Sequence, residues 1–438
     1  MKIETLKKSH LKRNIIIGVV AVLIISAVIL NFTRAKYRVT QSIPLVNGTI
    51  NYSLADLNIV AITVDGESVD TIPDGNYELT ENSYCTVDGE EDSSISISYD
   101  SNTKNLTVTP FTTKGTKCYL DFVTATTKKV DTILGTIEVN LDKPDFSKTA
   151  QADCSGKSNC EETNGIYEET TSKGTTYYWR GDVDNNWVSF AGSYWRIIRI
   201  NEDGTIRMIY QGTSVQTTGT GTQIGKNSFN SSMDDNMYVG YMYTENEARG
   251  LSSSSTIKKE LDDWYRNNLQ NYADKIDTNA GFCGDRELSG NGGTGTTETY
   301  YAGYSRLKSG RNPTLECKNN SDLYTTKESN QGNKALNYPI GLITADEVAY
   351  AGAITNSSNE SFYLYTGQIY WTMTPCEFSS YVTSMLAFLF PVGRGGRFDT
   401  LNGRAILQHG VRPVINLRSD ITISGGDGTA SNPYVVAT

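Results

Sequence analysis

The chain has 438 residues, of which 38% are hydrophobic, and it contains 39 Gly, 10 Pro and only two His. This composition excludes collagen-like, mucin-like and wholly disordered chains, and the length is typical of two or three domains. The formal net charge of −10 argues against nucleic acid as a partner, because an acidic body repels phosphate backbones.

The N-terminal region combines basic residues with an apolar run. Residues 15–30 are sixteen apolar or small residues without a charge, and Phe32 extends the run. Five basic residues precede it, which favours a cytoplasmic N-terminus. We therefore expect a cytoplasmic tail at 1–14 and an uncleaved transmembrane anchor at 15–32, with the later residues outside the cell. A cleaved secretion signal is the alternative.

Residues 40–145 contain short alternating or apolar runs separated by Asp-Gly, Asn-Gly and Lys-Gly turns. Six or seven strands at this spacing predict an all-β, sandwich-like domain. Because no cluster of functional groups stands out there, we expect it to serve as a stalk. Residues 146–175 are polar and predict a linker that contains a small disulfide loop.

Seven cysteines occur in a chain that we expect to be exported, where even sets of cysteines predict disulfides. Six cysteines allow fifteen connectivities, and proximity in sequence favours one of them. None has the C-x-x-C spacing of zinc or thioredoxin-like centres. Cys376 is left over, as a buried free thiol or as part of a site. The favoured pairs are Cys85–Cys118, Cys154–Cys160 and Cys283–Cys317.

Residues 176–438 predict a mixed α+β domain. Residues 195–200 and 205–210 read as two strands of a hairpin, with Asp203-Gly204 in the turn. Apolar residues recur at helical spacing over 256–276, after Ser254 or Ser255 as the cap. A second helix begins at Thr344, where Glu347 completes a capping-box pattern, and it ends near Gly352.

Cofactor and catalytic signals are weak. Asp182–Asn186 resembles the start of a calcium loop, but Trp187 replaces the turn glycine and Ser193 the bidentate glutamate, so a polar turn is the better interpretation. We expect no cofactor and no metal, apart from weak Ca²⁺ binding by surface Asp/Asn loops. His409 has no evident catalytic partner, so we expect no enzyme activity.

In the last domain YWTMTP at 370–375 is followed by a diverse stretch and then by GVRPVINL at 410–417. This order of motifs resembles that of bacterial surface proteins with a C-type-lectin-like fold. This broad group includes the formylglycine-generating enzymes and the variable proteins of diversity-generating retroelements. The resemblance implies that these two strands flank a ligand-facing segment. Trp195 and Trp371 are expected in the core, and Arg412 is expected to be structural.

The segment 376–409 differs in composition from its neighbours. It combines an apolar run at 385–390 with arginines, an odd cysteine and a histidine, a mixture typical of binding surfaces. Its position matches the variable residues of retroelement-diversified proteins, and an ordinary structural loop is the alternative. The candidate ligand-binding residues are Cys376, Phe378, Tyr381, Thr383, Met385, Ala387, Leu389, Arg394, Arg397, Asp399, Asn402, Arg404, Leu407 and His409.

Together these features predict a single-pass cell-surface protein with an extracellular recognition domain. The expected function is adhesion to a surface protein or glycan through 376–409, with no role for nucleic acid. Two alternatives stay open: an enzyme of the formylglycine-generating-like fold that acts on envelope substrates, and a structural pilin-like subunit. A catalytic residue beside Cys376 would favour the enzyme, and burial of 376–409 against a second copy would favour the subunit.

Overall fold

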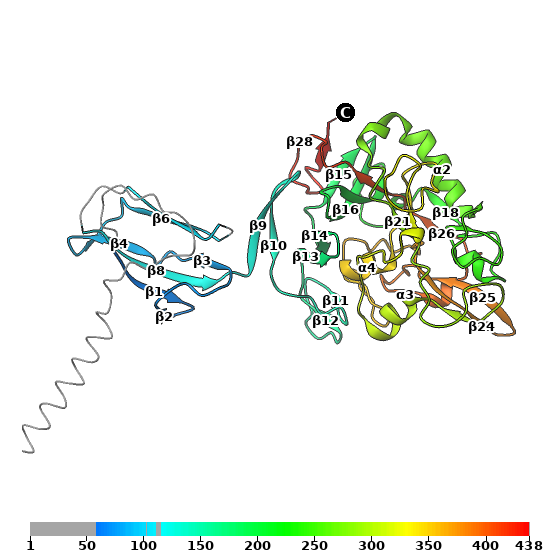
Figure 1. The fold of residues 1–438 in the computed structure, drawn as a ribbon, viewed down its shortest axis with the longest axis horizontal. Coiled ribbons are helices and arrows are strands. Elements are labelled where there is room, and N and C mark those ends of the chain that lie inside the picture. The colour runs from blue at the N-terminus through cyan, green and yellow to red at the C-terminus, as the bar shows by residue number, and fades with distance from the viewer. Residues whose placement is uncertain (1–57, 102, 111–114, 438) are drawn as a thin grey trace, which may run out of the picture. The chain divides into compact units, whose positions relative to one another are not determined.

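The computed structural model describes residues 58–101, 103–110 and 115–437 (Figure 1). The chain divides into two compact units, Met1–Ala125 and Thr126–Thr438. The predicted tail and anchor at 1–32 lie outside the described residues. Among the residues that are described, no helix is both long enough and apolar enough to span a membrane. The described residues are rich in strands, which form several sheets in the two units.

The described part of the first unit is a six-stranded sheet with a separate hairpin. The sheet order is β2-β1-β8-β4-β5, β3 also pairs with β8, and β6 pairs with β7. Phe122 on β8 is fully buried and Tyr99 of the hairpin packs edge-on against its ring, so the two layers share one core. The strands are β1 (Asn58–Val64), β2 (Glu67–Val69), β3 (Tyr77–Leu79), β4 (Tyr84–Val87), β5 (Glu90–Glu91), β6 (Ser96–Asp100), β7 (Asn105–Thr109) and β8 (Lys117–Thr124).

The boundary between the units lies earlier than the sequence indicated. β9 (Thr127–Thr132) and β10 (Gly135–Asn140) form a hairpin, and β10 pairs in parallel with β13 (Gly165–Thr171) of the second unit. Residues 126–145 therefore belong to the second unit and not to a stalk domain that ends at 145. The sequence predicted six or seven strands over 40–145, where the described residues form ten, and sequence patterns do not show which sheet a strand joins.

The predicted linker at 146–175 is also part of the second unit. It contains β11 (Thr149–Ala150), β12 (Cys160–Glu161) and β13. The backbone N–H of Ala150 donates to the Gly352 carbonyl, and the Asn359 side chain donates to the Ala150 carbonyl. The expected small disulfide loop is present, but the segment is fixed to the domain and does not act as a free spacer.

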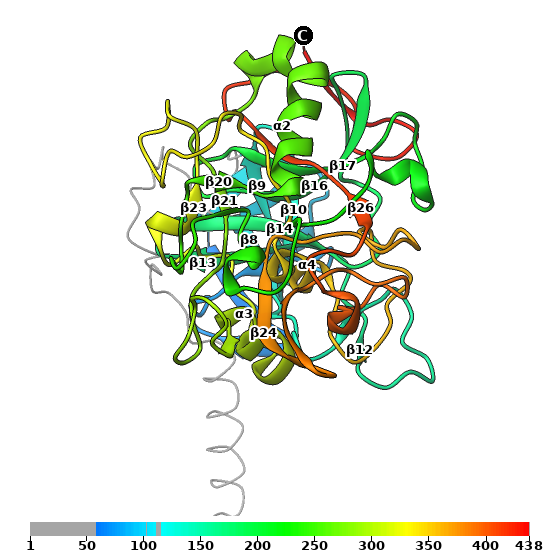
Figure 2. The same ribbon diagram turned by 90° about the vertical axis from the view of Figure 1, so that its right-hand side faces the viewer.

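A ten-stranded mixed sheet forms the centre of the second unit. Its order is β28-β29-β15-β16-β14-β13-β10-β9, and β17 pairs with both β16 and β27. The helix α2 and the strand β24 lie at opposite ends of this unit (Figure 1, Figure 2). The remaining strands of the sheet are β14 (Gly174–Arg180), β15 (Trp187–Phe190), β16 (Ser193–Ile200), β17 (Ile206–Gly212), β27 (Val414–Leu417), β28 (Ile423–Gly425) and β29 (Tyr434–Val436).

The predicted hairpin and both predicted helices are confirmed. β16 and β17 pair in antiparallel register from Trp195–Tyr210 to Ile200–Ile206. The first helix, α2 (Thr256–Asn268), is capped by the Ser255 side chain but ends eight residues before 276, where the chain continues as the 3-10 helix η3 (Gln270–Lys275). The second, α4 (Ala345–Ala351), has the complete capping box of Thr344 and Glu347 and ends at Gly352.

The core of the second unit is rich in aromatic side chains and in buried arginines. Trp195 and Trp371 are fully buried, as expected. Arg412 is also buried, and its guanidinium donates to the carbonyls of Tyr210 and Leu364, which confirms a structural role. The shorter elements are β18 (Gly225–Asn227), β19 (Met242–Tyr243), β20 (Ser253–Ser254), β21 (Phe282–Cys283), β22 (Thr299–Tyr300), β23 (Leu323–Tyr324), β24 (Pro375–Tyr381), β25 (Ser384–Leu389), β26 (His409–Val411), α3 (Ala302–Tyr304), the 3-10 helices η1 (Thr220–Thr222), η2 (Asn236–Val239), η5 (Asn320–Asp322) and η6 (Thr400–Asn402), and the π-helix η4 (Ser305–Gly310).

Candidate functional site

The segment 376–409 folds as a hairpin followed by a loop that covers it. β24 and β25 pair from Pro375–Leu389 to Tyr381–Ser384, which leaves a two-residue turn of Val382 and Thr383. The first strand also pairs with β22. After β25 the chain returns beside it, where the Ala405 N–H donates to the Ala387 carbonyl. The hairpin lies at the outer edge of the second unit (Figure 1).

Five of the predicted ligand-binding residues are buried, which corrects their assignment. Cys376, Phe378, Ala387 and Leu389 have no exposed surface, and His409 is 6% exposed. Cys376 and Phe378 lie on β24, which is flanked by β22 and β25, and the free edge of β25, with Ala387 and Leu389, bonds to the returning chain at 403–405. The His409 ring packs against Trp371, and its Nε2 lies 2.7 Å from the Asn402 carbonyl oxygen. These side chains hold the hairpin in place.

The leftover cysteine is a buried free thiol. Burial, assisted by the nearby Glu377 carboxylate, raises the pKa of the Cys376 thiol well above its usual value, so the reactive thiolate is disfavoured. The other six cysteines of the chain form the three disulfides that sequence proximity favoured. No second thiol is therefore left for paired-cysteine chemistry at Cys376.

The other nine predicted residues are at least partly accessible. The Arg404 guanidinium lies over the Tyr381 ring, 5.2 Å from its centroid, and the same ring meets Phe388 edge-on. This contact joins the end of the hairpin to the returning chain. Four of the nine are exposed, namely Tyr381, Thr383, Arg394 and Arg397, and five are half-buried, namely Met385, Asp399, Asn402, Arg404 and Leu407.

Three exposed apolar residues of the same segment were missed by the sequence reasoning. Val382 is 85% exposed, Leu401 is 73% exposed and Ile406 is 40% exposed. Val382 has a backbone φ of 59°, a left-handed conformation that is unfavourable for a β-branched residue. We predicted no turn at 382–383, so no signal in the sequence singled out Val382. We call Tyr381, Val382 and Thr383, together with Arg404, the hairpin apex.

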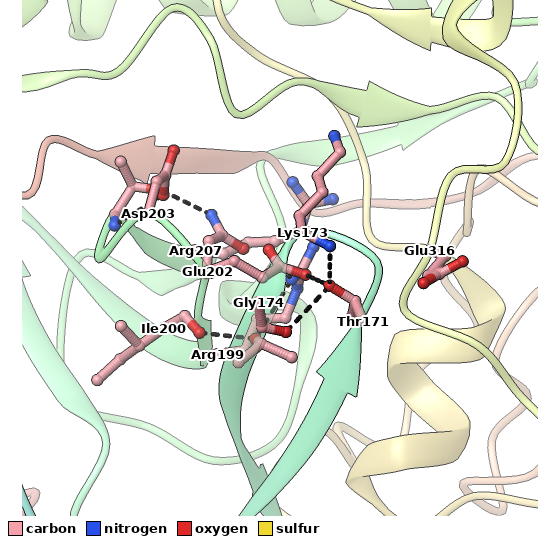
Figure 3. A network of polar contacts seen from close by, with 12 residues as sticks. Thr171, Lys173, Gly174, Arg199, Ile200, Glu202, Asp203, Arg207 and Glu316 are labelled. Atoms are coloured by element: carbon pink, nitrogen blue, oxygen red, sulfur yellow. Dashed lines mark hydrogen bonds and ion pairs between the residues drawn. The ribbon is translucent and has the colours of Figure 1, made fainter.

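A separate cavity of about 440 Å³ lies in the second unit, and no residue of 376–409 lines it. Its walls come from segments far apart in sequence, including the β13–β14 turn, the start of α4 and the Cys283–Cys317 disulfide. Figure 3 shows the turn side of this cavity. The sequence reasoning did not find it, because its charged residues are dispersed along the chain.

One side of the cavity is an ion-pair network around Glu347. The Arg207 Nε lies 2.5 Å from Glu347 Oε1, and the Arg199 Nε lies 3.3 Å from the same oxygen. Burial raises the pKa of the Glu347 carboxyl, but the charges of Arg207 and Arg199 outweigh this effect and leave that pKa below its ordinary value. Glu347 therefore stays ionised and fixes both arginines.

A second network places one arginine between two carboxylates. The Arg306 Nη2 atom lies 2.6 Å from Asp285 Oδ2 and 2.8 Å from Asp346 Oδ2. Burial of Asp285 and the charge of Asp346 together outweigh the attraction of Arg306, and they raise the pKa of Asp285 to about 7. This part of the cavity therefore holds more negative charge than its arginine neutralises.

The rim of the cavity lies between the β13–β14 turn and the segment 314–317. The Thr171 hydroxyl donates to Glu202, and the Ser172 backbone N–H donates to Glu316. In Figure 3 the Lys173 side chain extends away from this network, and Glu316 lies across from the turn. The rim is therefore polar, and the Ser172–Glu316 hydrogen bond connects its two segments.

The stretch 182–186 forms a structural turn. The Asp184 side chain accepts from the Trp187 indole N–H, and the Asn185 side chain accepts from the Trp179 indole N–H. In the part of the chain that the structure describes, no group of three or more His, Cys, Asp or Glu residues is placed to hold a metal ion.

Comparison of the chain with models of protein families, with curated proteins and with solved structures gave no match.

Proposed function

We propose that this is a cell-surface recognition protein that binds a protein or glycan ligand through the hairpin apex and the adjacent exposed residues. In this account the run at 15–32 anchors the chain, and the first unit separates the recognition domain from the membrane. The three disulfides support an oxidising, extracytoplasmic location. The mechanism is binding without chemistry.

We also propose that the second unit is a variant of the C-type-lectin-like fold. The order of elements supports this: a Trp-containing hairpin, α2, α4, the YWTMTP segment before β24 and the VRPV segment at β27. Trp371 of the first motif and Arg412 of the second are both buried. In this proposal the two motifs form the frame from which the segment 376–409 extends.

The observation that carries the proposed function is Val382. A β-branched residue in the left-handed region costs about 1–2 kcal/mol, and an apolar side chain gains nothing from exposure to water. Glycine or asparagine would fit this turn without strain. Val382 nevertheless occupies it and is 85% exposed. A side chain that harms the free protein is explained if it contributes contact area in a complex.

A binding screen tests this proposal. The labelled full-length chain is applied in detergent to arrays of glycans and of extracellular proteins. The test variant combines Tyr381→Ser, Val382→Gly, Leu401→Ser and Ile406→Ser, all at exposed positions. The control combines Val215→Ser and Val435→Ser, which are exposed elsewhere on the same unit. We expect capture to fall at least tenfold in the test variant only, and equal capture by both variants would refute the apex as the site.

If the segment 376–409 is diversified by a retroelement, its buried residues must stay constant. We expect a near-copy of the codons for 376–412 beside a reverse transcriptase gene, with adenine differences concentrated at exposed positions such as Tyr381 and Arg397. Sequencing the locus and its variants tests this. Variation concentrated at Phe378 or Leu389 would contradict it, because both are fully buried.

A further inference from the structure

The carboxylates at the edge of the cavity are not neutralised by neighbouring cations. Asp203 and Glu316 both line the cavity, yet among the described residues no ion pair joins either of them to Lys, Arg or His. Each accepts hydrogen bonds instead, Asp203 from Thr205 and Glu316 from Ser172. Their negative charges are therefore available to a ligand.

The arginines of the cavity are already occupied. Arg207 donates to the carbonyls of Gly281 and Leu342 and pairs with Glu347. Arg306 is held between two aspartates, and Arg199 contacts two glutamates. An incoming carboxylate or phosphate would have to break these pairs at a cost in desolvated charge. An anionic ligand is thus disfavoured.

The lining also argues against a neutral sugar ring. No aromatic side chain lines the cavity in the described part of the chain, so it offers no flat apolar face for stacking. The charged lining consists of six acidic side chains and four basic ones: Glu202, Asp203, Asp285, Glu316, Asp346 and Glu347 against Lys173, Arg199, Arg207 and Arg306. The volume of about 440 Å³ is within the range of small-molecule sites.

We propose that this cavity binds a small molecule that carries one or more primary ammonium groups, with Asp203 and Glu316 as its recognition carboxylates. The ammonium donors would pair with these carboxylates at the rim and reduce the excess negative charge deeper inside, beside Asp285 and Asp346. Lys173 at the same rim opposes the ligand and limits its affinity. A free diamine and an amino sugar share this chemistry. The inference is independent of ligand capture by the hairpin apex.

Calorimetric titration of the full-length chain at low ionic strength and pH 6.5, where both amines are protonated, tests the site with three probes. These are 1,4-diaminobutane, glucosamine and, as the matched neutral sugar, N-acetylglucosamine. We expect at least one of the two amines to bind and N-acetylglucosamine to bind at least tenfold more weakly. Binding of the diamine alone would assign a free polyamine, and binding of glucosamine alone would assign an amino sugar. Equal binding of the neutral sugar, or failure of both amines, would overturn the proposal.

Two sets of rim variants locate the binding. Asp203→Asn with Glu316→Gln keeps the hydrogen-bond acceptors but removes both charges, and should weaken amine binding at least tenfold. Lys173→Met removes an exposed cation and should strengthen binding severalfold. The control, Glu245→Gln with Glu247→Gln, removes two exposed charges outside the cavity and should change nothing.

Unchanged amine binding in the rim double variant, or an equal loss in the control, would refute the cavity as the site. Lys173→Met keeps the test decisive if the double variant fails to fold, because weaker binding in it would also contradict the proposal. The fourfold variant of the apex and its adjacent exposed residues should bind amines normally, so failure of the apex proposal and failure of this one are distinguishable.

Discussion

The hairpin apex and the charged cavity differ in the kind of chemical group that each leaves without a complementary partner. The apex exposes apolar groups on a strained turn, whereas the cavity partly buries carboxylates without enough cations. An exposed apolar group gains free energy from any complementary surface, so the apex fits a large partner. A carboxylate in a cavity gains it only from a matching donor, so the cavity fits a small and specific one. The two proposals therefore assign two different kinds of recognition to one unit.

Removal of a buried arginine should have the largest effect on stability. Arg207→Ala leaves the buried Glu347 carboxylate with a single, longer ion pair, and we expect a loss of about 3–5 kcal/mol in the free energy of unfolding. All five tryptophans lie in the second unit, so urea denaturation followed by tryptophan fluorescence reports on that unit.

The matched control for Arg207 is Arg266, whose ion pair with Asp263 is exposed. Arg266→Ala should cost no more than about 1 kcal/mol. If the two substitutions cost the same, the network around Glu347 does not stabilise the cavity wall, and the contrast between the cavity and the surface fails.

The pH dependence of stability sharpens the account of the cavity. Because the pKa of Asp285 is raised from 3.8 to about 7, the folded state binds more protons than the unfolded state between these values. Stability from this group is therefore present below pH 4 and is lost as the pH rises towards 7. The shift corresponds to at most about 4 kcal/mol.

Asp285→Asn should remove this contribution. In the parent chain, the contribution of Asp285 to the free energy of unfolding falls between pH 4 and pH 7. In the variant we expect a smaller fall over this range. Urea denaturation at half-unit pH steps measures it. An unchanged pH profile would show that Asp285 is neutralised by Arg306, and that the cavity has no excess of charge there.

Relief of the strained turn should have the smallest effect, with the opposite sign. Val382→Gly removes the left-handed β-branched residue, and we expect the unit to gain about 1 kcal/mol of stability or less. The same substitution should weaken ligand capture. Thermal unfolding and array binding measured on one preparation test the pair of effects. A loss of stability would show that Val382 serves the fold, which would remove the main support for the apex.

Local signals in the sequence predicted local structure well. The Asp203-Gly204 turn specified the β16–β17 hairpin, and Thr344 with Glu347 specified the start of α4, because each depends on a few neighbouring residues. The pairing of six cysteines also followed proximity. The membership of 126–175 in the second unit was not predictable, because it depends on which sheet edge β10 and β13 find.

The candidate site was predictable only in part. Composition singled out the segment 376–409, but it did not separate Phe378, which is buried, from Tyr381, which is exposed on the same strand. Phe378 lies where β24 is flanked by both β22 and β25, whereas Tyr381 is the last residue of β24, beside the turn. The cavity was out of reach because Asp203 and Glu316 are more than a hundred residues apart and no motif connects them.

Footprinting of the complex tests the central claim most directly. A ligand from the array is bound to the full-length chain, which is then exposed to hydroxyl radicals and analysed residue by residue by mass spectrometry. The account predicts strong protection of Tyr381, Val382 and Leu401, and no protection of Val215 or Val435. Protection confined to other surfaces, with the apex labelled as fast as in the free chain, would contradict it.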